Sequence, residues 1–168
     1  MQNHTQLPTG LSFSYETERL ILRLPSTDYL REIHDFLYRN RSCFEKYEPT
    51  APENYYTLDF QQTLARCELK LALKLSSVRF YVFLKEDPST IIGTVCLHNI
   101  IKMPYFTSEV GYKFDASYQH HGYAREALSM ALSVGFYGLG LHKIFARCMP
   151  ENTPSRNLLH ATGFFEEG

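Results

Sequence analysis

Several features that would indicate other classes of protein are absent from this sequence. No apolar run approaches the roughly 20 residues that cross a bilayer, and the N-terminus lacks the basic and then apolar order of a signal peptide. These two absences predict a cytoplasmic protein with no membrane partner. The four cysteines show no close spacing such as C-x-x-C, which zinc sites and disulfide frameworks have. We therefore interpret them as reduced thiols: Cys43, Cys67, Cys96 and Cys148.

The charge of the chain is nearly balanced, with a formal net charge of −1 at pH 7 and a pI near 6.6. A nucleic-acid partner would require a strongly basic surface, so the sequence predicts none. The histidines are scattered apart from His120 and His121, and adjacent residues rarely point at one ion, so we predict no metal site. The length suits one domain over 1–168, in which the polar residues 1–15 form a loose arm.

Hydrophobic periodicity predicts a succession of strands and helices. In chain order they are a strand over 18–24, a helix over 28–39, an irregular aromatic segment over 43–56, a helix over 58–75, strands over 78–84, 91–101 and 109–114, a helix over 123–136, a strand over 142–149 and a last helix closed by Gly163. Short turns between the strands that precede the central helix predict an antiparallel meander. A helical crossover makes the following strand parallel, so the sequence predicts an α/β fold with a mixed sheet.

A glycine, Gly122, stands where the strand over 109–114 gives way to the helix from Tyr123. The first amides of a helix have no intrahelical acceptor, and the positive end of the helix dipole lies there. An anion such as a pyrophosphate therefore finds several donors at once. Gly122 and the small Ala124 would let that anion approach the backbone closely. A plain strand-to-helix turn is the other interpretation of the same glycine.

Two spaced motifs resemble those of a known family. The first is Gln119-x-x-Gly122-x-Ala124, and the second, about 30 residues further along, is Asn152-x-x-Ser155-x-x-Leu158-x-x-x-x-Gly163-Phe164. In this order and spacing they resemble the acetyl-coenzyme A loop and the following helix of the GNAT N-acetyltransferases. The segments that flank the first motif, 109–112 and 123–128, and the earlier segment 17–23 look like the RimJ/RimL branch of that family. One departure is the absence of tryptophan, because Tyr47 stands where this branch usually has one.

The resemblance implies a GNAT-like fold in which the two parallel strands splay apart and acetyl-CoA lies in the gap. The family normally adds a closing pair of strands, so the resemblance also implies that the sequence stops short of them at Gly168. The residues implied in acetyl-CoA binding are Tyr112, Phe114, Gln119, His120, His121, Gly122, Tyr123, Ala124, Arg125, Asn152 and Ser155. His120 and His121 replace the usual Gly-Lys or Gly-Arg, which removes one fixed charge and leaves Arg125 to compensate.

Acetyl transfer to an amine needs a deprotonated amine and a proton donor to the departing thiolate. Many relatives from other branches place a tyrosine acid seven residues after the motif asparagine, where this chain has Leu159. The acid role therefore falls on Ser155 or on water. Glu109 is the candidate base, acting through water, although an ordinary sheet glutamate is equally compatible with the sequence. A covalent mechanism at Cys148 is a minor alternative because no His or Asp is patterned to activate it.

The acceptor pocket is expected between the segment over 43–56 and the Glu109 strand, where Glu45, Glu48 and Glu53 would attract a cationic amine. The leading hypothesis is an acetyl-CoA-dependent N-acetyltransferase, a monomer or homodimer, that acts on a protein or peptide N-terminal α-amine of the ribosomal-protein type. A small-molecule amine is the alternative acceptor, and a non-catalytic acyl-CoA-binding sensor is the rival hypothesis. A nucleotide-binding domain is disfavoured because G-x-x-x-x-G-K-[ST] and G-x-G-x-x-G are both absent.

Overall fold

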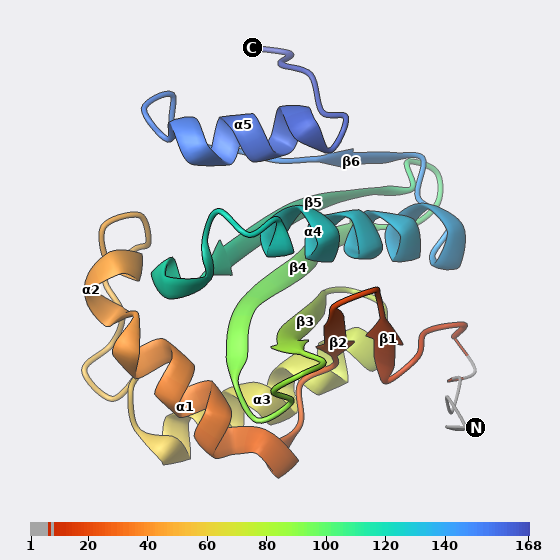
Figure 1. Ribbon diagram of the computed structural model, residues 1–168. Coiled ribbons are helices and arrows are strands. Elements are labelled where there is room, and N and C mark those ends of the chain that lie inside the picture. The colour runs from red at the N-terminus through yellow and green to blue at the C-terminus, as the bar shows by residue number, and fades with distance from the viewer. Residues whose placement is uncertain (1–6, 8) are drawn as a thin grey trace.

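Residues 7 and 9–168, which the computed structural model describes, form a six-stranded sheet with helices on both faces (Figure 1). The strands, ordered in the sheet as in the chain, are β1 (Ser14–Glu16), β2 (Leu20–Arg23), β3 (Val78–Leu84), β4 (Ile91–Ile101), β5 (Thr107–Phe114) and β6 (Lys143–Phe145). The α-helices are α1 (Leu30–Arg39), α2 (Arg41–Phe44), α3 (Leu58–Leu73), α4 (Tyr123–Ser133) and α5 (Thr153–Ala161). Two short 3₁₀ helices are η1 (Thr27–Tyr29) and η2 (Ala116–Tyr118), and a π-helix, η3 (Val134–Gly138), continues from α4. Neighbouring strands pair antiparallel from β1 to β5, and β6 pairs parallel to β5. The predicted meander, parallel crossover and mixed sheet are confirmed.

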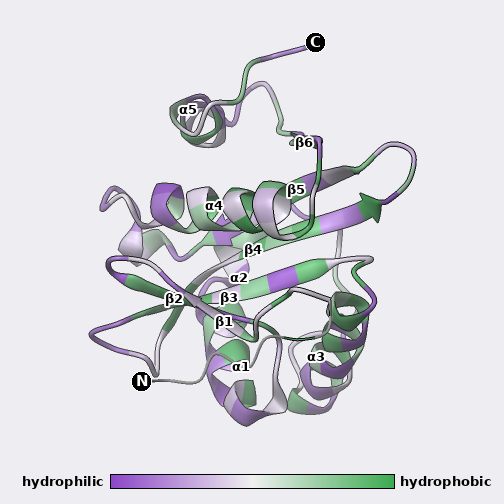
Figure 2. Cartoon of the chain, turned by 90° about the vertical axis from the view of Figure 1, so that its right-hand side faces the viewer, coloured by the Kyte–Doolittle hydropathy of each residue, from purple (hydrophilic) through white to green (hydrophobic). Residues whose placement is uncertain are grey.

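The sheet separates two hydrophobic cores because its strands present apolar side chains to both faces. Helix α4 covers one face, and α1 with α3 covers the other (Figure 1, Figure 2). On the α4 face, Phe80, Val82 and Val95 of the sheet share a core with Leu128 and Ala131. The core on the other face is formed by Tyr29, Ile33, Phe36, Leu37, Phe44, Ala65, Tyr81, Phe83 and Ile91. Among the helices described, none combines the length and the apolar character needed to span a membrane.

The N-terminal segment joins the sheet. Leu11 is fully buried in the core on the α4 face, and Ser14–Glu16 pairs with β2. The prediction of a loose arm over 1–15 is therefore wrong for residues 11–15, because a buried apolar side chain and strand hydrogen bonds hold them in place. Residues 1–6 and 8 of the predicted arm lie outside the described residues.

The parallel pairing of β5 with β6 is short. It joins Thr107–Glu109 to Lys143–Phe145, after which β5 continues to Phe114 without a strand partner on that side in the part of the chain described. The strand predicted over 142–149 is therefore wrong in length, because the chain leaves β5 after Phe145. This divergence is the splaying of the two central strands that the family resemblance implies.

A buried carboxylate, that of Asp115, fixes the point where β5 gives way to the loop before α4. It accepts hydrogen bonds from Arg39 Nε at 2.6 Å, Asn40 Nδ2 at 3.0 Å and the Ser117 amide at 2.9 Å. Burial alone would raise the pKa of Asp115, but the bonds from Asn40 and Arg39 outweigh it and the pKa lies below its usual value. The charged carboxylate of Asp115 thereby joins the C-terminal end of α1 to the start of the loop before α4.

Asp115→Asn should lower the free energy of unfolding by about 2 kcal/mol near neutral pH, because hydrogen bonds to a charged acceptor are the stronger class. The depressed pKa of the folded state means that this stabilisation is present above the unfolded pKa of about 3.9 and is lost as the pH falls through the folded value. Urea unfolding across the acid range should therefore show a shallower loss of stability for the variant. Asp35→Asn, at an exposed aspartate of α1, is the matched control. Parallel pH profiles for wild type and Asp115→Asn would contradict the assignment.

Candidate functional site

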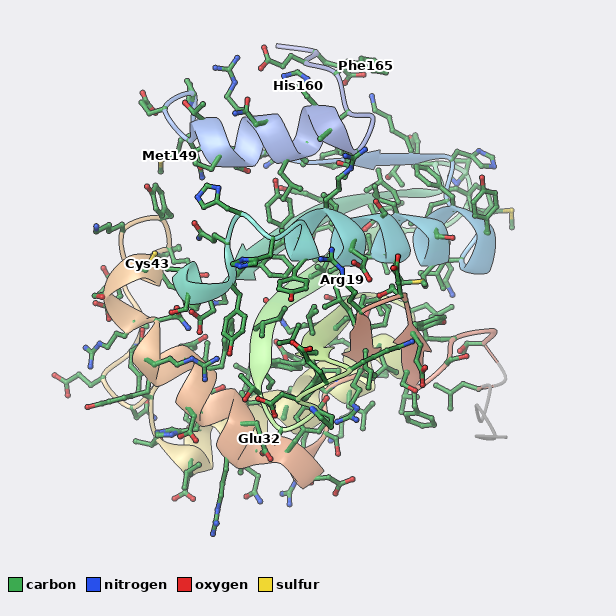
Figure 3. All side chains as sticks on the ribbon, in the orientation of Figure 1. Arg19, Glu32, Cys43, Met149, His160 and Phe165 are labelled. Atoms are coloured by element: carbon green, nitrogen blue, oxygen red, sulfur yellow. The ribbon has the colours of Figure 1, made fainter. Side chains whose placement is uncertain are left out.

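A groove of about 1030 Å³ opens where β5 and β6 part. The predicted binding residues that line it are Tyr112, Phe114, Gln119, His120, Gly122, Tyr123, Ala124, Arg125, Asn152 and Ser155. Two other predicted site residues, His121 and Glu109, lie outside this lining. Cys43 and Met149 also line the groove, and Figure 3 shows Cys43 beside α2 and Met149 near the start of α5. The structure therefore brings the two sequence motifs together around one opening.

The loop before α4 has a left-handed backbone at two positions, His120 with a φ of 64° and Gly122 with a φ of 81°. Gly122 directly precedes the first turn of α4, where a residue with a Cβ would be strained. His121 Nδ1 donates to the Gln119 carbonyl oxygen at 2.6 Å, and the His121 ring stacks on that of Tyr123. His121 thus shapes the loop from outside while the N-terminal end of α4 faces the groove.

A link between Arg19 and Glu126, which neither periodicity nor the motifs reveal, ties this loop to the sheet. The Glu126 carboxylate accepts from Thr17 Oγ1 at 2.5 Å, from the Arg19 amide at 2.8 Å and from Arg19 Nε at 2.7 Å. Arg19 Nη1 donates to the His121 carbonyl oxygen at 2.8 Å, and its guanidinium lies 4.6 Å from the centre of the Tyr123 ring. Burial alone would raise the pKa of Glu126, but the bonds from Thr17 and Arg19 lower it overall. Figure 3 shows Arg19 beside α4.

The α5 side of the groove carries two neighbouring hydroxyl groups. Asn152 caps α5, and its Oδ1 accepts from the Ser155 amide at 3.3 Å. Ser155 Oγ lies 2.8 Å from the Tyr112 hydroxyl, which also donates to the Ser155 carbonyl oxygen at 3.2 Å. Burial raises the pKa of Tyr112 and the hydrogen bond with Ser155 offsets only part of that rise, so the phenol keeps its proton at neutral pH. A protonated phenol beside a serine hydroxyl can supply a proton to a base that forms in the groove.

Glu109 is the last β5 residue that pairs with β6, so it lies where the two strands begin to separate. Its side chain is 12% exposed, and one carboxylate oxygen lies 3.8 Å from Arg147 Nε. Its role as a base stays a prediction.

Cys148 lines the groove. Within the described residues, no three His, Cys, Asp or Glu side chains are grouped as a metal ion would require, and the absence of a metal also stays a prediction.

The end of the groove beside α2 is aromatic and acidic, with lining residues Cys43, Phe44, Tyr47 and Glu48. Of the three glutamates predicted to attract an amine, Glu48 lines this end. Glu45 instead accepts from Arg41 Nε at 2.8 Å, and Glu53 lies outside the lining. The segment over 43–56 therefore borders the groove as expected, through fewer acidic residues than the sequence predicts.

Residues 19–165 match a family model described as acetyltransferase (GNAT) domain. A relative named probable N-acetyltransferase YjcK, from Bacillus subtilis (strain 168), is 32% identical over 129 residues, which are 77% of this chain and 71% of the relative. Two uncharacterized N-acetyltransferases, YnaD of Bacillus subtilis (strain 168) and p20 of Bacillus licheniformis, align over about half of their own lengths, 51% and 54%.

Solved structures share the fold. Ribosomal-protein-S5-alanine acetyltransferase from Vibrio fischeri superposes with a TM-score of 0.86 at 30% identity, covering 92% of this chain and 84% of its own. Spermidine N-acetyltransferase from Vibrio cholerae, solved with CoA and spermine, gives a TM-score of 0.72 at 28% identity, covering 90% and 84%. These likenesses confirm the GNAT-like fold that the two motifs predict.

Arg19→Ala should loosen the loop before α4, because it removes the guanidinium that joins Glu126 to the His121 carbonyl. We expect backbone amides over 119–124 to exchange with deuterium about tenfold faster, with smaller changes in the strands. Glu126→Gln should act in the same direction, since it removes the charge of the same link. Arg31→Ala, at an exposed arginine of α1, is the matched control. Exchange that stays at the wild-type rate in both loop variants would show that the link does not order the loop.

Proposed function

The chain belongs to the GNAT acetyltransferase family, and we propose that it transfers the acetyl group of acetyl-CoA to the α-amine of a protein or peptide N-terminus. The observation that carries this proposal is the groove where β5 and β6 separate. It has a helix N-terminus on one side, and aromatic side chains with one glutamate, Glu48, at one end. The 30% identity with an S5-alanine acetyltransferase supports an N-terminal α-amine as the acceptor.

The groove has the chemical features that a long anionic acyl carrier needs. The amides at the start of α4 can bind a pyrophosphate, and Gly122 leaves them accessible. Beyond Glu109 the β5 backbone can pair with the amides of the pantetheine arm in place of a neighbouring strand. Asn152 stands on the opposite wall, where its Oδ1 is engaged by the Ser155 amide and its Nδ2 is the group that can donate to the arm.

Acetyl-CoA supplies an activated thioester. The amine nitrogen bonds to the acetyl carbon as the carbon–sulfur bond breaks. The nitrogen then releases its extra proton to water to leave the neutral amide, and the departing thiolate takes a proton. Ser155 Oγ is the proposed donor of that proton, and Tyr112, whose hydroxyl lies 2.8 Å away, replenishes it. A phenol from β5 would thus serve where other branches use a tyrosine on the last helix, at the position of Leu159.

The amine must lose a proton before it attacks, and Glu109 is the proposed base. Alternation along β5 places Glu109 on the same face as Gly111 and Lys113, both of which line the groove. Water between the amine and this carboxylate would carry the proton, since Glu109 is not among the residues that line the groove.

A small-molecule amine is the second candidate acceptor, supported by the 28% identity with spermidine N-acetyltransferase. Release of CoA, measured against a panel of peptides and small amines, distinguishes the possibilities. Turnover on peptides supports N-terminal acetylation, whereas turnover on small amines alone overturns that substrate class and leaves the transferase. Binding of acetyl-CoA without turnover on any acceptor would instead indicate an acyl-CoA sensor.

Gly122→Val should weaken acetyl-CoA binding about tenfold or more, because the added side chain blocks approach to the first amides of α4. Its Cβ would also lie 3.3 Å from Arg19 Nη2. Gly140→Val is the matched control, since Gly140 has a similar φ of 68° and, apart from its own chain neighbours, no described atom within 4 Å of the position of its Cβ. Isothermal calorimetry gives both dissociation constants. An affinity that Gly122→Val leaves unchanged would remove the loop from the site.

Ser155→Ala should lower kcat about tenfold to a hundredfold with little change in acetyl-CoA affinity, because the hydroxyl acts only as thiolate charge develops. Tyr112→Phe should lower kcat in the same direction. The double variant should lose little more than the larger single effect, since the two hydroxyls act as a unit. Ser133→Ala, at an exposed serine of α4, is the control. If turnover on the best peptide survives Ser155→Ala unchanged, the acid assignment fails.

A further inference from the structure

The acceptor end of the groove holds an ion pair between Lys113 of β5 and Glu48 of the segment after α2. Lys113 Nζ lies 2.8 Å from Glu48 Oε1 and 4.9 Å from the centre of the Phe44 ring. The Lys113 side chain is 17% exposed and that of Glu48 is 42% exposed. Both residues line the groove, so a ligand at this end meets a positive and a negative group side by side.

Lys113 lies where burial destabilises the charged form of its side chain. Burial lowers the pKa of Lys113, although the hydrogen bond and charge of Glu48 act in the opposite direction. The other charged groups that act on it are Arg79 and Glu68, which are themselves joined at 2.6 Å and add no net charge. A half-buried pair of this kind contributes little to stability once desolvation is counted, so its position in the groove points to recognition.

We propose that Lys113 and Glu48 together select an α-aminoacyl acceptor, an inference that rests on the proposed acetylation of N-termini. Glu48 attracts the ammonium form of the incoming amine, and Lys113 donates a hydrogen bond to the carbonyl oxygen of the same residue. The nitrogen and the carbonyl oxygen of an N-terminal residue lie about 3 Å apart. This spacing matches the 2.8 Å between Lys113 Nζ and Glu48 Oε1, so one residue can engage both groups.

The same pair disfavours polyamines. A polyamine has further ammonium groups and no carbonyl oxygen, so when it binds at Glu48 it offers Lys113 no carbonyl acceptor and places a like charge beside it. Discrimination then comes from a repulsive contact as well as from an attractive one. Lys113 and Glu48 are 65 residues apart, and no local pattern in the sequence joins them.

The test compares an alanine-initiated peptide with spermidine as acceptors for wild type and for Lys113→Met. We expect kcat/KM for the peptide to fall about tenfold or more while that for spermidine stays or rises, with an unchanged dissociation constant for acetyl-CoA. Lys113→Arg keeps a donor and a positive charge and should restore most of the preference for the peptide. Lys46→Met, at an exposed lysine near Glu48, should leave both values unchanged.

Equal losses on both acceptors would make Lys113 a structural residue and overturn the inference, as would unchanged turnover of the peptide. If Lys113→Met does not fold, Glu48→Gln replaces it, and a KM for the peptide that does not rise overturns the inference. Wild-type protein that acetylates spermidine and no peptide would end the proposed substrate class and this inference together. The acceptors that wild-type protein uses therefore test the proposed function. The effects of the variants on the preference between peptide and spermidine test the inference alone.

Discussion

The short pairing of β5 with β6 is the constraint on which the site depends. The two strands share hydrogen bonds only as far as Glu109 and Phe145, whereas β5 continues to Phe114. Continued pairing would fill the space between them, and separation leaves backbone donors and acceptors that need other partners. The sheet tolerates the separation because the two cores hold its other strands together from both faces. The groove is therefore a consequence of where strand pairing ends.

The loop beside the groove is held at both ends by charged groups from distant parts of the chain. His120 has a left-handed backbone that costs a non-glycine residue roughly 1–3 kcal/mol, so surrounding contacts must maintain it. Asp115 fixes the start of the loop to the end of α1. Arg19 and Glu126 fix its end to the turn between β1 and β2. Together these links present the first turn of α4 to the groove in one conformation.

Local features of the fold and site are predictable from the sequence, and long-range side-chain pairs are not. β3 and β4 have the predicted bounds, 78–84 and 91–101, because turn residues delimit their apolar runs. β6 is shorter than predicted, since periodicity reports the face that a side chain takes and not whether the backbone is paired. Gly122 precedes α4 as its motif predicts. The link between Arg19 and Glu126, 107 residues apart, depends on packing that no local pattern encodes.

The two chemical tasks of the proposed reaction are divided between neighbouring residues of β5. Tyr112 points to Ser155 and α5, where a thiolate would be protonated, and Lys113 points to Glu48, where an amine would be recognised. Successive residues of a strand face opposite sides of the sheet, so one strand separates the two tasks by a single step along the chain. A slip of one residue in the pairing of β5 with β4 would exchange the two faces. The antiparallel register of these central strands is therefore as important to the proposed chemistry as the residues that would perform it.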